Sequence, residues 1–226
     1  METNRSPERT PLDDLIGDST RLLVRQKKEW GEILIGFESR NRFEIFDEAG
    51  RTAGFAAEEG TGIGQIFLRN FLGRMRAAKV HIYNGSGKDV GRGEKPFRFY
   101  FHRMEVFDGQ EKIGAIQRKF SILHRLFTVE DASGQEVLQI KSPFFRIWTF
   151  KLLVDGQEVG RISKKWGGIL REAFTDADTF GVEFSHPKLP QTVKKLLLVA
   201  VFLVDFVCFE GNSKSGVAFD LLGSGG

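Results

Sequence analysis

Residues 159–210 read VGRISKKWGGILREAFTDADTFGVEFSHPKLPQTVKKLLLVAVFLVDFVCFE. This stretch runs from a basic segment with a tryptophan, through an acidic turn, into a strongly apolar segment near the C-terminus. The apolar segment, Leu196 to Phe209, predicts a helix. Such a helix can span a membrane or form the buried axis of a β-rich domain, and the two alternatives imply different proteins.

Length and charge favour the buried helix. A membrane-spanning helix requires roughly 20 apolar residues, whereas runs of about 10–14 are more typical of buried core helices. The segment from Leu196 to Phe209 is shorter than a span, and Asp205 interrupts it. A carboxylate near the middle of the bilayer costs about 2.5–3.5 kcal/mol on the insertion scale. We therefore expect a core helix.

The composition indicates a globular protein with a bias toward β structure. The 226 residues suffice for one large domain or two small ones, and the 22 Phe favour pleated, half-buried surfaces. A net charge of +3 permits attraction to anionic lipid or nucleic acid but requires neither. The single cysteine, Cys208, excludes an internal disulfide framework, and no signal-peptide pattern is found. We expect a cytosolic compartment.

The domain organisation follows from the turn and period signals. Residues 1–20 are polar and lack a sustained period, so we expect a disordered lead-in. From residue 21 onward short alternating runs, such as RFEI at 42–45, predict strands with one buried face. Residues 21–211 are expected to form one domain, and residues 212–226 a loose Gly/Ser-rich tail.

An internal repeat supports a barrel or sheet built by duplication. Residues 108–134 read DGQEKIGAIQRKFSILHRLFTVEDASG, and residues 155–181 read DGQEVGRISKKWGGILREAFTDADTFG. Each unit predicts a DG turn, a strand with paired basic residues, and an aromatic-bearing strand that enters an acidic turn. The C-terminal helix would fill the lumen, because no other segment is long and apolar enough.

The sequence offers no conventional catalytic constellation. The four histidines lie far apart without ligand spacing, and no nucleophile, base and acid can be assembled. The NGSGK segment at 84–88 lacks the spacer of a phosphate loop, and Asp89 stands where Ser or Thr would bind Mg²⁺. We therefore do not expect an enzyme that makes or breaks covalent bonds.

The acidic turn is a candidate calcium site. In a 12-residue loop that starts at Asp176, Asp176 and Asp178 occupy positions one and three. Position twelve is Pro187, so no bidentate carboxylate closes the loop. The alternative is an acidic β-turn that leads into a strand, and any Ca²⁺ affinity would be weak.

Paired basic residues form a candidate lipid-binding surface. The repeat places Arg118 and Lys119 beside Phe120, and Lys164 and Lys165 beside Trp166. A tryptophan with neighbouring lysines suits a membrane–water interface, where each Lys or Arg contributes about 1 kcal/mol near an anionic surface. The alternative is a solvated strand face. The expected partner is an anionic phospholipid or membrane surface, and no nucleic acid is expected.

Several motifs resemble the phospholipid scramblase family. GRISKKWGGILREAFTDADTFGVEF at 160–184 and the apolar segment KKLLLVAVFLVDFVCFE at 194–210 resemble the C-terminal half of that family. GFESRNRFEI at 36–45 and FAAEE at 55–59 resemble its first strands. The resemblance covers roughly residues 22–210.

The resemblance implies a tubby-like fold, a barrel of about twelve strands around a central C-terminal α-helix. It also implies Ca²⁺-dependent, ATP-independent movement of phospholipids between leaflets, by a protein peripheral to or inserted in the plasma membrane. The family's calcium segment maps onto Asp176, Asp178, Phe180, Val182, Phe184 and Pro187, and its acidic final position is Pro187 here. The alternative function is a non-enzymatic tubby-like module that binds anionic head groups through Lys164, Lys165, Trp166, Arg118 and Lys119.

Overall fold

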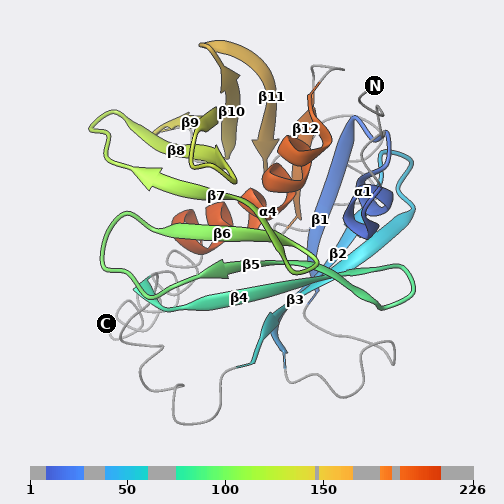
Figure 1. The fold of residues 1–226 in the computed structure, drawn as a ribbon. Coiled ribbons are helices and arrows are strands. Elements are labelled where there is room, and N and C mark those ends of the chain that lie inside the picture. Colours follow the sequence, from blue (N-terminus) through green and yellow to red (C-terminus); the bar gives the residue numbers. More distant parts are fainter. Residues whose placement is uncertain are drawn as a thin grey trace, which may run out of the picture.

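A closed antiparallel β-barrel surrounds a single long helix (Figure 1). The computed structural model describes residues 9–27, 39–60, 75–145, 148–164, 179–184 and 189–209. Among these residues, twelve strands follow one another around the barrel in sequence order, and β1 closes it against β12. This architecture confirms the barrel around a C-terminal helix that the resemblance implied.

The elements have the following bounds. The helices are α1 (Pro11–Ile16) and α4 (Gln191–Cys208). The strands are β1 (Arg21–Lys27), β2 (Ser39–Phe46), β3 (Thr52–Glu59), β4 (Ala78–Asn84), β5 (Asp89–Lys95), β6 (Arg103–Asp108), β7 (Glu111–Lys119), β8 (His124–Asp131), β9 (Glu136–Pro143), β10 (Thr149–Val154), β11 (Gln157–Ser163) and β12 (Thr179–Phe184).

Three hairpin turns at one end of the barrel are built alike. Asp47, Asn84 and Asp131 each accept backbone N–H bonds from the residues two and four positions ahead. The fourth residue of each turn is a glycine with positive φ, which a side chain would strain. The segments DEAGR, NGSGK and DASGQ therefore encode the same turn, and the rejected phosphate loop is a hairpin.

A register shift recurs next to the turn in five hairpins. On the second strand of each, one residue has no partner in the ladder, and that residue is apolar and packs against the core. These residues are Ala53, Val90, Ile113, Val137 and Val159. Because a bulge bends and twists its strand, the repeated bulge curves the sheet inward at this end.

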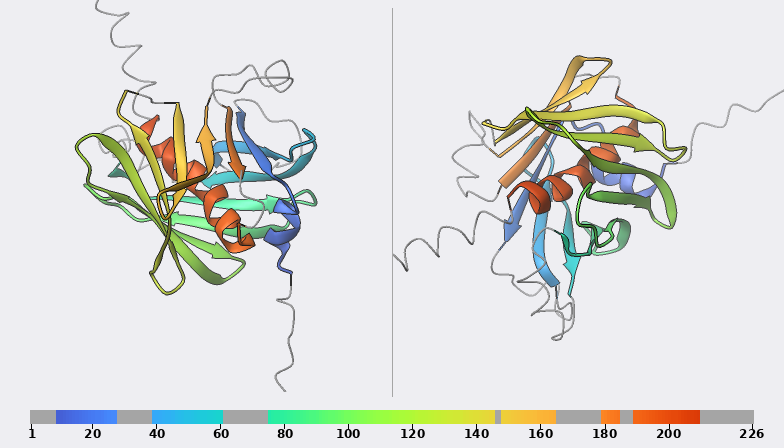
Figure 2. Two further views of the ribbon diagram at one scale, coloured as in Figure 1. Left: turned by 90° about the horizontal axis from the view of Figure 1, so that it is seen from above. Right: turned by 90° about the vertical axis from the view of Figure 1, so that its left-hand side faces the viewer.

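Helix α4 forms the axis of the barrel, as its length and charge predicted (Figure 2). Every residue from Leu196 to Val204 is at most 1% exposed. The helix contacts β5, β6, β7, β8 and β12 as well as α1. A helix that is apolar all round is stable only when it is enclosed, and the barrel encloses it.

The expectation of disorder for residues 1–20 is wrong for residues 9–20. Thr10 caps α1 with a capping box that includes Asp13, and Pro11 occupies the first helical turn. Leu12, Leu15 and Ile16 are buried in the same core as α4. The helix is too short to show a sustained period, and it is stabilised by tertiary packing that the sequence pattern does not reveal.

Candidate functional site

The two ends of the barrel differ. Tight turns connect β2–β3, β4–β5, β6–β7, β8–β9 and β10–β11 at the end where α4 begins. At the opposite end, where α4 terminates, longer connections at 96–102, 120–123 and 144–148 join β5–β6, β7–β8 and β9–β10. Antiparallel neighbours place these three loops at the same rim of the barrel.

Exposed apolar side chains gather at this rim. Among the described residues, every large hydrophobic side chain that is exposed lies in or beside the three loops. Phe145 is 84% exposed, Tyr100 79% and Ile122 77%. We call the set the apolar rim; it comprises Phe97, Phe99, Tyr100, Phe101, Phe120, Ile122, Leu123, Phe144, Phe145 and Trp148. Monomeric proteins rarely leave such contiguous apolar surface without a functional reason.

Hydrogen bonds hold the three loops beside one another. The Arg118 backbone N–H donates to the His102 carbonyl at 2.7 Å, and Gln117 Nε2 donates to the Phe101 carbonyl at 2.7 Å. The Phe144 N–H donates to the Leu123 carbonyl at 3.4 Å. The apolar rim is therefore a continuous feature of the barrel.

The three loop segments of the rim contain only basic charges, although Glu130 of β8 pairs with Arg103 and lies 3.7 Å from Lys119. Segments 95–103, 117–126 and 140–151 contain no Asp or Glu, whereas each contains at least two Lys or Arg residues. Apolar and basic side chains without acidic ones are typical of surfaces that dock on anionic membranes.

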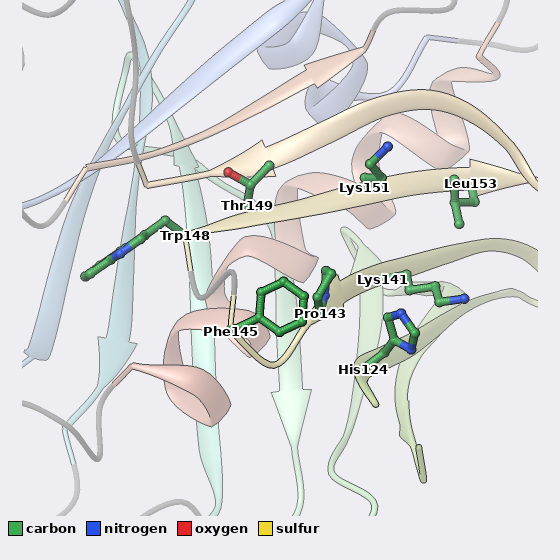
Figure 3. A pocket seen from close by; sticks show the side chains of 8 residues that line it. All are labelled: His124, Lys141, Pro143, Phe145, Trp148, Thr149, Lys151 and Leu153. Carbon is green, nitrogen blue, oxygen red and sulfur yellow. The ribbon is translucent and has the colours of Figure 1, made fainter. Parts of the chain in front are cut away.

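A groove opens between β9 and β10 at the same rim (Figure 3). The ladder between the two strands is short: residues 139–141 of β9 pair with residues 151–153 of β10. Beyond these pairs the strands separate toward the rim. Pro143 supplies no backbone N–H to continue the ladder. The cavity has a volume of about 580 Å³ and is lined by His124, Lys141, Pro143, Phe145, Trp148, Thr149, Lys151 and Leu153.

Trp148 connects the rim to the central helix. Its indole stacks on the Phe209 ring, with the ring centroids 5.7 Å apart. Phe209 in turn packs edge-on against Phe150 and Phe180. The end of α4 is thus fixed to the loop that lines the groove.

Of the residues predicted to bind lipid, the structure describes Arg118, Lys119 and Lys164. Arg118 and Lys119 end β7 at the rim, where Lys119 is half-exposed and lies 3.7 Å from Glu130. Lys164 directly follows β11, and three strands separate β11 from β7. Lys165 and Trp166 lie outside the described residues. The structure does not place Lys164 next to Arg118 and Lys119.

Lys164 points into the end of the barrel. Its side chain is 9% exposed, and its ammonium lies 3.9 Å from an Asp205 carboxylate oxygen. The same ammonium lies over the Phe180 ring at 4.6 Å and the Phe209 ring at 4.5 Å. These contacts make Lys164 a link between β11, β12 and α4.

The candidate calcium ligands Asp176 and Asp178, together with Pro187, lie outside the described residues. Within the described residues, no group of three or more His, Cys, Asp or Glu side chains could hold a metal ion. In the part of the chain that the structure describes, no helix combines the length and apolarity needed to cross a membrane.

Sequence reasoning missed the apolar rim and the groove. The Phe-rich composition predicts half-buried strand faces, but ten large hydrophobic residues of the described chain are exposed in loops. A signal existed, because FRFYF, FSIL and PFFRIW are apolar runs in which the only charges are basic. Their gathering at one rim depends on the barrel topology, which the runs themselves do not encode.

Comparison with known proteins identifies the family to which the chain belongs. The model of the family described as Scramblase matches residues 4–211. The chain is 32% identical to human "Phospholipid scramblase 1" over 216 residues, which cover 87% of this chain and 66% of that protein. It is 31% identical to human "Phospholipid scramblase 2" over 204 residues, covering 84% and 67%.

A more distant relative also matches most of this chain but only half of its own length. The "Phospholipid scramblase family protein C343.06c" of Schizosaccharomyces pombe is 23% identical over 193 residues, covering 81% of this chain and 50% of that protein. The chain thus spans 66% or less of the human and mouse proteins named "Phospholipid scramblase 1". No solved structure matches.

Proposed function

This chain belongs to the scramblase family, and from that membership we propose that it moves phospholipids between the leaflets of a membrane, in both directions and without ATP. The names of the relatives say that they are phospholipid scramblases, and movement in both directions without ATP is what the family resemblance implies. Lipid movement requires no bond chemistry, which suits a barrel for which the sequence offers no catalytic set. The apolar rim is the observation that carries the proposal.

The rim is suited to dock on an anionic membrane. Aromatic side chains at head-group depth contribute apolar burial, and amphipathic elements of this kind penetrate about 5–10 Å into the interface. Basic residues such as Arg98, Arg118 and Arg125 add attraction to anionic head groups, at about 1 kcal/mol each near the surface. Docking on the cytoplasmic face of the plasma membrane, where anionic lipids are abundant, follows from this chemistry.

The rim, rather than α4, would contact the lipid. The barrel encloses the apolar side chains of α4. Insertion of α4 into a bilayer would therefore require the barrel to open. Bulky rim side chains wedged among head groups would separate neighbouring lipids and thin the leaflet locally. This perturbation lowers the barrier to head-group passage without insertion of the helix.

The test combines vesicle binding with lipid translocation. In vesicles with phosphatidylserine, the protein should bind and equilibrate a fluorescent phospholipid between leaflets. The triple variant Phe120→Ser/Ile122→Ser/Leu123→Ser should lose both activities while it remains folded, because these side chains are 70–77% exposed. The matched control Phe120→Leu/Ile122→Leu/Leu123→Ile keeps the rim apolar and should retain both. Equal translocation by the two triple variants would refute the proposal.

A second candidate is a lipid-docking module that does not translocate lipid. The enclosed α4 is compatible with this function too, because docking through the rim requires no movement of the helix. In this case Arg118 and Lys119 would serve as head-group contacts together with Lys165 and Trp166, whereas Lys164, which points inward to Asp205, would not. Salt-sensitive vesicle binding without translocation by the unmodified protein would establish this function instead.

Calcium would have a limited role in either function. Asp176 and Asp178 supply two carboxylates, but Pro187 cannot supply the closing one, so the donor set does not fit a tight site. We propose weak binding at most and assign no step of lipid movement to the ion. The Asp176→Ala/Asp178→Ala variant, assayed with and without Ca²⁺, tests this, and calcium-stimulated translocation that the variant loses would contradict it.

A further inference from the structure

The groove between β9 and β10 contains an unusual pair of like charges. Lys141 on β9 and Lys151 on β10 are directly opposite partners in the ladder, and both line the groove. Directly opposite side chains lie on one face with their Cβ atoms roughly 5 Å apart, where like charges destabilise the sheet. An arrangement of this kind is stabilised when an anion lies between the two ammonium groups.

The two lysines differ in their partners. The Lys151 ammonium pairs with Glu158 at 2.7 Å, so its charge is largely compensated. Lys141 has no ion pair or side-chain hydrogen bond to any residue in the described part of the chain. His124 lines the same wall of the groove (Figure 3). The groove therefore retains an uncompensated positive charge next to two further nitrogen donors.

The rest of the groove is apolar. Phe145, Trp148 and Leu153 line it, and no acidic side chain does. Phe145 and Trp148 also belong to the apolar rim, so the groove is continuous with the surface that faces the membrane in the proposed function. Its volume of about 580 Å³ lies within the roughly 300–1,000 Å³ typical of small-molecule sites.

We propose that this groove binds one anionic glycerophospholipid drawn from the docked membrane. The phosphate lies between Lys141 and Lys151 with His124 beside it, and the glycerol and upper acyl chain run along Phe145 and Trp148 toward the rim. The groove offers charge-assisted contacts to a phosphate next to an apolar channel. This combination matches a phospholipid better than a free phosphate, because a free phosphate would leave the apolar side chains in contact with water. The inference rests on the proposed function for its choice of membrane lipid.

Binding of a soluble short-chain lipid tests the groove without vesicles. Dihexanoyl phosphatidylserine, titrated calorimetrically below its micelle concentration, should bind the full-length protein. Lys141→Gln should weaken binding about tenfold through loss of a charge-assisted contact. Phe145→Ser should also weaken it, and this side chain is exposed enough to change without loss of the fold. The matched control Lys88→Gln removes the same charge from the β4–β5 turn at the opposite end of the barrel and should bind as the unmodified protein does.

Competition by two ligands without acyl chains identifies which part of the lipid is bound. Inorganic phosphate and glycerophosphoserine, which lack acyl chains, should compete only weakly. Full competition by inorganic phosphate would overturn the lipid assignment, and equal lipid affinity of the Lys141→Gln and Lys88→Gln variants would overturn the site. Vesicle docking and translocation without binding of the soluble lipid would overturn the groove and leave the proposed function intact. Soluble-lipid binding that depends on Lys141, without translocation, would support the groove and refute the translocator function.

Discussion

The ammonium of Lys195 on α4 lies 2.7 Å from a carboxylate oxygen of Asp108 at the end of β6, although 87 residues separate the two in the chain. The same ammonium lies 2.7 Å from Asp13 and 2.9 Å from the Thr10 hydroxyl. The side chains of Lys195 and Asp108 are 6% and 5% exposed. One buried cation thus joins α1, the barrel and the central helix at the end of the barrel opposite the rim.

The first prediction concerns this cluster. Lys195→Met should lower the free energy of unfolding by about 3–5 kcal/mol, because it leaves two largely buried carboxylates without their cation. Urea denaturation measures the loss. Lys112→Met, which removes an exposed ion pair with Glu105, should change stability by no more than about 1 kcal/mol. Equal losses in the free energy of unfolding for the two variants would show that the buried cluster stabilises the fold no more than an exposed ion pair does.

Acid should release α1 through Asp13. Burial raises the pKa of Asp13, but the Lys195 ammonium and hydrogen bonds from Thr10 outweigh burial and hold it below its ordinary value. A lowered folded-state pKa adds stability that is complete above the unfolded-state pKa and is lost as pH falls through the folded-state value. The loss should therefore begin below about pH 4.

The Asp13→Asn variant isolates this contribution. Asp47, Glu48 and Asp131 also have lowered pKa values, so they contribute to acid loss in both proteins. Unfolding free energies measured from neutral pH to about pH 2.5 should converge for the two proteins as the pH falls below about pH 4. A constant difference over the whole range would rule out the linkage to Asp13.

Gly160 should resist substitution by alanine. It follows the bulge at Val159, and a Cβ there would overlap the carbonyl oxygen of Glu183 on β12. Gly160→Ala should cost about 1–3 kcal/mol, because β11 and β12 must move apart. Gly85→Ala is the control: its Cβ would meet nothing closer than a carbonyl oxygen at 4.0 Å, and its effect should stay within about 0.5 kcal/mol. Thermal unfolding of the two variants measures the contrast.

Asp205→Leu tests whether α4 stays inside the barrel. The substitution removes the carboxylate 3.9 Å from the Lys164 ammonium and should lower stability by about 1–3 kcal/mol. It should not raise the fraction of protein that sediments with vesicles, because an enclosed helix gains nothing from greater apolarity. Asp205→Asn controls for charge alone. A folded Asp205→Leu protein with a clearly larger membrane fraction would mean that α4 reaches the lipid.

The core of the fold could be predicted because it depends on local patterns. The short Leu196–Phe209 run and its interruption by Asp205 favoured a buried axis over a span, and α4 is indeed enclosed. Alternation at residues 42–45 and the DG turns indicated strands and hairpins, and the structure has both. Helix α1 was not predicted because six residues are too few to show a period, and much of its stability comes from tertiary contacts, namely core burial of its apolar side chains and the Lys195–Asp13 ion pair.

The candidate site was less predictable. The repeat suggested that Arg118 and Lys164 occupy equivalent strands, yet equivalence in a repeat does not place two residues on the same patch. Three strands separate β7 from β11 around the barrel, and Lys164 turns inward to Asp205. Basic character was visible in the sequence, but the direction of each side chain was not.

Local periodicity, turn residues and the interrupted apolar run sufficed to establish strands, hairpins and a buried C-terminal helix, because each depends on neighbours close in the chain. The apolar rim and the Lys141–Lys151 groove arise only when closure of the barrel brings three loops to one end and aligns β9 with β10. Such sites join residues that share no local pattern, so their proximity depends on register and closure rather than on any single segment.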